Sequence, residues 1–166
     1  MKVADTKKQV KRHIKRSIAA NKFAILSVQG VPQHAGGNGL NYSYTVGLDR
    51  LGLPELFICG VIDNRILGMM LKNQAQAWIK EGKAEEVVRT DIVKRSDGDP
   101  TPMRSGMHPV NVGHMLFNYC AELKQRSSTN LRIWQMLYPD PANLLPGEEG
   151  YDTRYVQPRL APAVSQ

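Results

Sequence analysis

The segment between Asp63 and Gly82 constrains the fold most, because it carries the clearest helical pattern in the chain. Its apolar residues recur at three- and four-residue spacing from Ile66 to Trp78, which places them on one side of a helix. Asp63 is a suitable N-cap, and Gly82 stands where a left-handed residue is needed to end a helix. We therefore predict a helix here, with one apolar side that must pack against other elements.

Short segments that are typical of strands lie on both sides of this helix. They are apolar and β-rich, or they alternate between two kinds of residue. The strands are predicted over residues 23–31, 41–48, 55–61, 86–95, 103–112 and 131–138. A Gly-rich loop is predicted over 32–39, and the turn sequence at 96–100 makes the two strands around it a predicted hairpin. Two further helices are predicted, over 7–20 and 113–125.

This order of elements predicts an α+β fold with three helices and a mostly antiparallel sheet, either open or curled into a split-barrel-like core. We expect a single domain of three parts. Residues 1–22 form a basic helix, residues 23–140 form the α+β core, and residues 141–166 form an extended arm rich in Pro and Gly.

The net charge of +7 lies entirely in the N-terminal segment, since residues 23–166 hold equal numbers of basic and acidic side chains. The predicted helix carries a narrow apolar stripe of Val10, Ile14 and Ile18 on a basic cylinder. The candidate partner-binding residues are Lys7, Lys8, Lys11, Arg12, Lys15 and Arg16. This pattern is typical of a helix that binds nucleic acid, an acidic protein or an anionic membrane surface, and equally of a solvated helix that covers the core.

Several kinds of function have no support in the sequence. No apolar run approaches the roughly 20 residues that cross a bilayer, and no apolar signal core follows the N-terminus, so we expect a cytoplasmic protein. Cys59 and Cys120 are predicted to be buried thiols, and the spacing of His108 and His114 does not suit a metal site. The motifs of phosphate loops and nucleophile elbows are absent, so an enzyme and a binding domain both stay open.

Aromatic and polar residues in two distant segments form the best candidate site. If the last strand pairs near the strand 41–48, their side chains would line one aromatic cleft with polar groups at its edge. The candidate ligand-binding residues are Tyr42, Ser43, Tyr44, Thr45, Trp134, Gln135, Tyr138, Asp140 and Tyr151. In the alternative interpretation the rings fill the core and Asp140 caps a turn.

Three blocks of the sequence resemble a bacterial and phage family of unknown function, DUF4262. The first is YTVGL at 44–48 with GLPEL at 52–56, the second is QMLYPD at 135–140, and the third comprises 146–151 and the pair Gln157 and Pro158. The resemblance spans about residues 23–160. It implies a single domain but no established activity.

The order of strands, turn and helix over 41–82 is also similar to the opening of flavin-reductase-like split barrels. That similarity implies a flavin- or nucleotide-like ligand whose phosphate meets the hydroxyls of Ser43 and Thr45 and the amides at the start of the helix after Asp63. It would also imply a homodimer. The sequence thus leaves two functions open: a ligand-binding domain, and an interaction protein of the counter-defence or regulatory kind.

Overall fold

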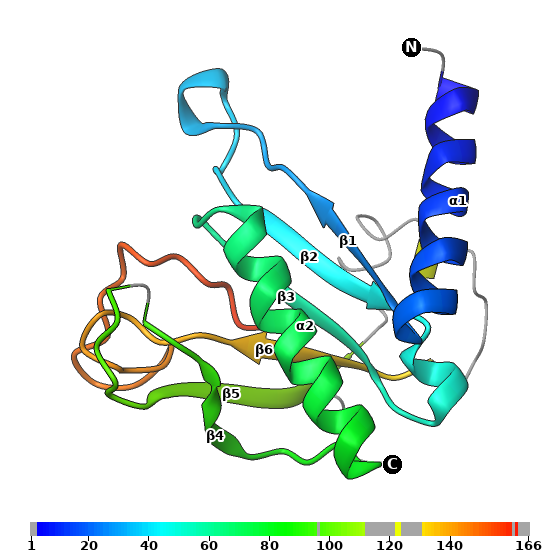
Figure 1. The fold of residues 1–166 in the computed structure, drawn as a ribbon. Coiled ribbons are helices and arrows are strands. Elements are labelled where there is room, and N and C mark those ends of the chain that lie inside the picture. Colours follow the sequence, from blue (N-terminus) through cyan, green and yellow to red (C-terminus); the bar gives the residue numbers. More distant parts are fainter. Residues whose placement is uncertain (1–2, 96, 112–121, 124–130, 161, 163–166) are drawn as a thin grey trace.

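The computed structural model describes residues 3–95, 97–111, 122–123, 131–160 and 162. Its two described α-helices are α1 (Val3–Asn21) and α2 (Asn64–Glu81). The strands are β1 (Ala24–Val28), β2 (Asn41–Val46), β3 (Glu55–Gly60), β4 (Val88–Val93), β5 (Met103–Val110) and β6 (Ile133–Leu137). Each predicted strand is therefore present, with shorter ends than the sequence suggested. Figure 1 shows how these elements are arranged.

The six strands form one sheet in the order β1-β2-β3-β6-β5-β4. All neighbouring pairs are antiparallel except β3 and β6, which confirms the prediction of a mostly antiparallel sheet. The split-barrel alternative is wrong, because the described sheet is not closed. Insertion of β6 between β3 and β5 separates the edge strands β1 and β4 by five strand spacings, about 24 Å across an extended sheet.

Helix α2 confirms the strongest prediction. The Asp63 carboxylate accepts a hydrogen bond from the Arg65 amide, and Gly82 ends the helix with a φ of 71°. The helix lies across one face of the sheet (Figure 1). Its Trp78 ring meets the Trp134 ring of β6 edge to face, with the ring centroids 5.5 Å apart. The apolar side of the predicted helix is thus buried against the sheet.

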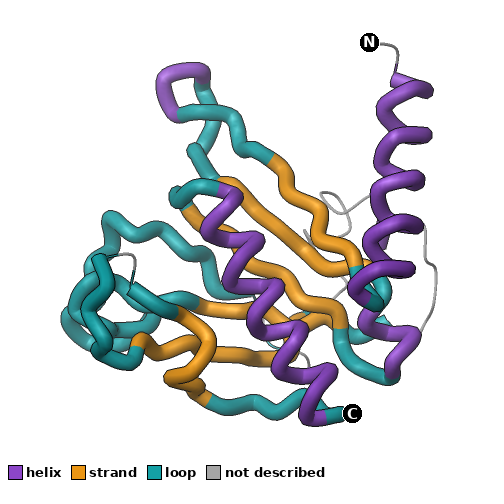
Figure 2. The backbone as a smooth tube through the Cα atoms, viewed as in Figure 1, coloured by secondary structure: helices purple, strands orange, loops and turns teal. Residues whose placement is uncertain are grey.

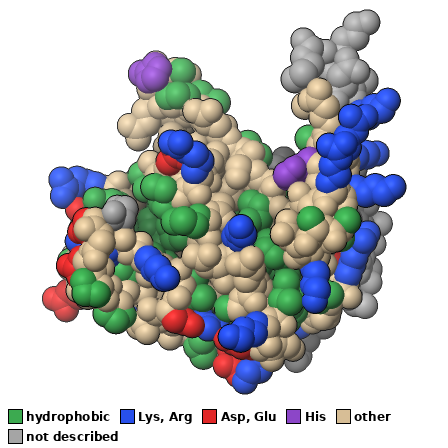
Figure 3. Space-filling view, in the orientation of Figure 1, with side chains coloured by type: hydrophobic (Ala, Val, Ile, Leu, Met, Phe, Trp, Pro, Cys, Tyr) green, Lys and Arg blue, Asp and Glu red, His purple; other side chains and the backbone are tan. Residues whose placement is uncertain are grey.

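Helix α1 lies beside the edge strand β1 and starts at Val3, four residues earlier than predicted. The His13 side chain hydrogen-bonds the Ile25 carbonyl at 3.2 Å, so the helix covers part of an edge that would otherwise be open to pairing. The Lys and Arg side chains lie along its outer side (Figure 3). No helix in the described part of the chain combines the length and the apolar character of a membrane span.

The third predicted helix, over 113–125, falls almost wholly outside the described residues, and so does Cys120. The described structure therefore has two α-helices where the sequence predicted three. Cys59 is a buried free thiol, as predicted.

Apolar side chains are buried on both faces of the sheet. The α2 face holds one core, which includes Leu56, Ile58 and Met136. The opposite face, called here the arm face, holds a second core around Tyr44, Phe57 and other strand residues, against which Leu160 of the arm is packed. Because both faces are covered, the side chains on both faces of β2, β3, β5 and β6 are mostly buried.

The connection between β2 and β3 is built around a buried carboxylate. Glu55 accepts hydrogen bonds from the Thr45 hydroxyl at 2.6 Å and from the Gly47 amide at 2.7 Å, with the Asp49 amide at 3.3 Å. The Thr45 hydroxyl in turn accepts the amide of Leu56 at 2.8 Å. Burial raises the pKa of the Glu55 carboxyl from 4.5 to about 7, although each of these donors favours the ionised form. The YTVGL and GLPEL blocks thus meet in one hydrogen-bond network.

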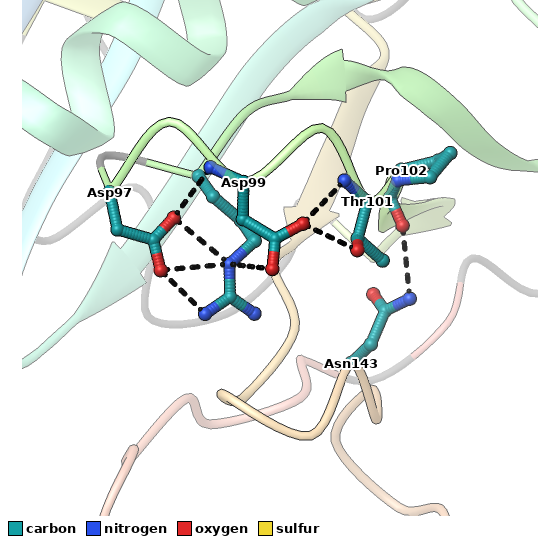
Figure 4. A network of polar contacts seen from close by, with 6 residues as sticks. Asp97, Asp99, Thr101, Pro102 and Asn143 are labelled. Atoms are coloured by element: carbon teal, nitrogen blue, oxygen red, sulfur yellow. Dashed lines mark hydrogen bonds and ion pairs between the residues drawn. The ribbon is translucent and has the colours of Figure 1, made fainter.

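The turn between β4 and β5 contacts the start of the arm. Arg95 donates hydrogen bonds to the carboxylate of Asp97, and Asp99 accepts from the amide and hydroxyl of Thr101 (Figure 4). The Asn143 amide then donates to the Pro102 carbonyl at 3.1 Å. The arm is therefore attached at its beginning to the hairpin that the sequence predicted.

Candidate functional site

A cavity of about 680 Å³ lies between the arm face of the sheet, the β1–β2 connection and the C-terminal arm. We call it the sheet–arm cavity. Tyr42, Phe57 and Cys59 of β2 and β3 form its floor, and Leu40 lies in the wall made by the β1–β2 connection. The arm contributes Pro158 and Leu160. No charged side chain is among the described residues that line it.

The floor of the cavity follows from the pairing of β2 with β3. Tyr42 is opposite Cys59 and Tyr44 is opposite Phe57, so these four side chains point to the same face. The Tyr42 and Phe57 rings have centroids 5.9 Å apart and planes tilted by 32°. Burial raises the pKa of the Cys59 thiol to about 12, so this group is protonated at neutral pH. The floor is an aromatic and thiol surface without charge.

The wall formed by the β1–β2 connection depends on glycine. This connection extends beyond the rest of the sheet (Figure 2). A Cβ atom at Gly30 would lie 1.9 Å from the Leu40 carbonyl oxygen, and one at Gly37 would lie 2.0 Å from the Val31 carbonyl oxygen. The Gly30 amide also donates to the Asn41 side chain at 2.9 Å. The Gly-rich sequence was predicted to be a flexible loop, and in the structure it is folded tightly on itself.

Two glutamines hold the arm against the sheet. The Gln135 amide nitrogen donates to the Pro158 carbonyl at 2.7 Å, and its oxygen accepts the Leu160 amide at 2.8 Å. In the reverse direction, Gln157 of the arm donates to the Tyr138 carbonyl at 2.7 Å and accepts the Tyr138 amide at 2.9 Å. Each side chain donates to one main-chain group and accepts from another, as a neighbouring strand would, so Gln135 and Gln157 position one wall of the cavity.

The predicted ligand-binding residues divide between the two faces of the sheet. Tyr42 lines the cavity, and Tyr44 and Gln135 lie on the same arm face. Trp134 and Tyr138 belong to the core under α2. The structure therefore does not bring these rings into the single aromatic cleft that the sequence suggested, because β3 separates β2 from β6 and successive residues of a strand alternate between faces.

The hydroxyls proposed for a phosphate have partners inside the protein. Ser43 hydrogen-bonds the Ser27 hydroxyl at 2.7 Å, and Thr45 bonds Glu55; neither Ser43 nor Thr45 is exposed. The start of α2 is capped by Asp63, a carboxylate that would repel a phosphate there. The region therefore offers no free hydroxyl donor to a phosphate, because both hydroxyls already form hydrogen bonds within the protein.

Asp140 and Tyr151 shape the arm. The Asp140 carboxylate accepts the Leu144 amide at 2.9 Å and the Asp152 amide at 2.8 Å, which closes the turn at the start of the arm. The Tyr151 hydroxyl donates to the Tyr155 carbonyl and also meets the Gln157 amide. For Asp140, this is the turn-capping alternative named from the sequence.

Several residues that line the cavity were not among those predicted from the sequence, including Leu40, Phe57, Cys59, Pro158 and Leu160. Phe57 and Cys59 could have been found by pairing 41–48 with 55–61 as an antiparallel hairpin, because this places them beside Tyr44 and Tyr42. No local signal identifies Pro158 and Leu160, which come from the far end of the chain.

His108 is a further buried polar side chain. Burial lowers the pKa of its imidazole, and its Nε2 atom has no hydrogen-bond partner among the described residues. It lies opposite Gln135 in the β5–β6 pairing, outside the described lining of the cavity. Within the described ranges, no group of three or more His, Cys, Asp or Glu side chains could hold a metal ion.

These features define a class of protein: a single-domain α+β fold whose open mixed sheet carries a helix on one face and residues of the C-terminal segment on the other, with a cavity between that segment and the sheet whose described lining is uncharged. The chain belongs to the family described as "Domain of unknown function (DUF4262)", which matches residues 18–152. The predicted resemblance is therefore confirmed. No curated protein and no solved structure matches the chain.

The family match begins at Ile18, in the last turn of α1, and ends at Asp152. It includes the sheet and the floor of the sheet–arm cavity. The six candidate partner-binding cations of α1 and the glutamine at position 157 lie outside it.

Proposed function

We propose that this protein binds a small, planar and uncharged molecule in the sheet–arm cavity. The observation that carries this proposal is the combination of volume and lining. About 680 Å³ falls within the usual range of small-molecule sites, and the described lining pairs two aromatic rings with aliphatic side chains and no charge. A charged ligand would lose its hydration in this cavity without gaining a partner of opposite charge, and this loss would oppose its binding.

A heteroaromatic ring suits this lining best. The ring system of a flavin or a nucleobase presents a flat apolar surface to Tyr42 and Phe57, and its edges could meet the Asn38 and Gln29 side chains of the cavity wall. A phosphate group would have to stay outside, because the described lining offers it no cation. The proposal therefore concerns the ring and not a whole nucleotide.

Binding is better supported than catalysis at this site. A thiol nucleophile needs a low pKa or an adjacent base, whereas burial raises the pKa of Cys59 to about 12. Its sulfur lies 3.9 Å from the amide nitrogen of Gln135 and 3.9 Å from the Pro158 carbonyl oxygen, and neither group is a base that could take its proton. The described site thus holds no activated nucleophile.

The first test is an absorption spectrum of the purified, unsupplemented protein from 250 to 500 nm, with mass spectrometry of what heat denaturation releases. Titration with lumichrome, the uncharged flavin ring system, and with riboflavin phosphate then follows by calorimetry. We expect lumichrome to bind more tightly than its phosphorylated relative. Absence of both a co-purified molecule and lumichrome binding contradicts the proposal.

A pair of variants locates the binding. Tyr42→Ala should weaken lumichrome binding about tenfold, because an aromatic contact contributes about 0.5–1.5 kcal/mol beyond its area. Tyr155→Ala is the matched control, since Tyr155 does not line the sheet–arm cavity. Equal losses in the two variants would place the ligand elsewhere.

A second proposed function is the binding of an acidic macromolecule by α1. The observation that favours it is the exposure of all six candidate cations on that helix. Among the ion pairs of the described residues, none involves these side chains. Their charge is therefore not neutralised within the described structure.

A further inference from the structure

The outer side of α1 is a continuous cationic surface, which we call the basic face. It consists of Lys7, Lys8, Lys11, Arg12, Lys15 and Arg16, all exposed. In Figure 3 these blue side chains run along the helix at the side of the molecule, while red and blue side chains are mixed over the body. The sequence beyond residue 22 is neutral overall, so the basic face dominates the electrostatic field of the protein.

The spacing of these cations follows the helix. Lys7, Lys11 and Lys15 form one row at four-residue intervals, and Lys8, Arg12 and Arg16 form the adjacent row. From Lys7 to Arg16 the helix rises about 14 Å, because each residue adds about 1.5 Å. Over the same length a nucleic acid duplex carries about eight phosphates, at one charge per about 1.7 Å of axis.

The apolar side of α1 is not available to a partner. Ile14 packs against the core on the arm face, and Ile18 lies against Gly47 at the end of β2. The basic face itself contains no aromatic residue and no large aliphatic one. A protein interface usually needs such residues as anchors, and a membrane-surface helix needs an apolar face to insert. Single-stranded nucleic acid is usually held by aromatic stacking, which this helix cannot offer.

We propose that the basic face of α1 binds the phosphate backbone of duplex nucleic acid without reading its sequence. This inference rests on the second proposed function and gives it a specific partner. Lys and Arg side chains contact the phosphates, and binding is favoured by the counterions that the duplex releases. The sheet–arm cavity takes no part in it.

The test uses the full chain and two fluorescein-labelled 20-base-pair DNA duplexes of unrelated sequence, titrated by anisotropy between 50 and 200 mM salt. Six phosphate contacts predict a slope of about −5 for log K against log salt, equal for both duplexes, since each contact contributes about 0.9. The variant Lys11→Gln with Lys15→Gln should reduce the slope to between −3 and −4, about −3.6. Glutamine preserves helix propensity, so α1 should stay folded, which circular dichroism checks.

The control removes the same charge elsewhere. Lys72→Gln with Lys80→Gln changes two exposed cations of α2 and should leave the slope unchanged. If both double variants alter duplex binding equally, only the net charge matters and the proposal is overturned.

Two further probes separate this inference from the proposed function on which it rests. Polyglutamate and phosphatidylserine vesicles are titrated under the same conditions. Binding to either one without binding to the duplex overturns the inference and, with polyglutamate, leaves the acidic-macromolecule function standing. Binding to none of the three probes removes both.

Discussion

Replacing Glu55 by Gln should stabilise the protein at pH 8, although it alters a carboxylate that accepts three hydrogen bonds. Burial raises the folded-state pKa of this group to about 7, against an ordinary value of 4.5. The folded protein therefore holds a proton at Glu55 more tightly than the unfolded chain does. The stability that this proton provides is complete below pH 4.5 and is lost as the pH rises through 7.

The magnitude follows from the shift. A difference of about 2.5 pKa units at about 1.36 kcal/mol per unit corresponds to about 3 kcal/mol of stability lost between pH 4.5 and 8. Glutamine resembles the protonated acid and does not titrate. Its oxygen can accept the Gly47 amide and its nitrogen can donate to the Thr45 hydroxyl, at a cost of about 1 kcal/mol for the altered hydroxyl pairing.

The assay is urea unfolding of the parent and Glu55→Gln at pH 5, 6, 7 and 8. The difference between their free energies of unfolding removes the contributions of all other titrating groups. We expect the two proteins to be about equally stable at pH 5, where the parent has already lost about 0.8 kcal/mol, and the variant to be about 2 kcal/mol more stable at pH 8. A difference that is independent of pH, with the variant less stable throughout, would refute the reasoning, since it would mean that the three donors keep the carboxylate ionised.

Two further predictions concern the packing of β6 and its arm. Gly60→Ala should lower the free energy of unfolding by about 1–3 kcal/mol, because the new Cβ would lie 1.8 Å from the Tyr138 hydroxyl oxygen. An unchanged urea midpoint would contradict this, since it would show that the Tyr138 ring moves aside at no cost. Gln135→Met should lower the free energy of unfolding by about 2 kcal/mol and speed tryptic cleavage at Arg159, because both hydrogen bonds to the main chain of the arm are lost. The control is Gln76→Met at an exposed position of α2, which should leave the cleavage rate unchanged.

Local patterns predicted the elements, and long-range pairing decided what they form. The caps of α2 at Asp63 and Gly82 depend on a few neighbouring residues, so the sequence was sufficient for them. The place of β6 beside β3 depends on a parallel pairing across about 80 residues of chain, for which no local pattern exists. The sequence therefore left an open sheet and a split barrel as alternatives, and the described sheet is open.

Sequence alone identified a residue of the candidate site only where the alternation of side chains along one strand determines which face the residue occupies. Tyr42 was identified from its own strand, and it does line the sheet–arm cavity. Trp134 and Tyr138 were grouped with it, but the register of β6 turns them to the opposite face. The arm residues Pro158 and Leu160 reach the cavity through the hydrogen bonds of Gln135, a docking that composition and periodicity do not encode.

The central place of β6 also governs how the chain is made. During synthesis β1, β2 and β3 can form one piece of sheet and β4 and β5 another, but neither piece hydrogen-bonds the other until β6 joins them. At about 5–20 residues per second, the roughly 80 residues from β3 to the end of β6 take about 4–16 s to synthesise. Throughout that time β3 presents an unpaired edge to other nascent chains, and β5 does so once Val110 has been made. A chain that ended before Ile133 would therefore hold two half-sheets with unpaired edges, which favour aggregation, and β6 is the strand that pairs with both edges.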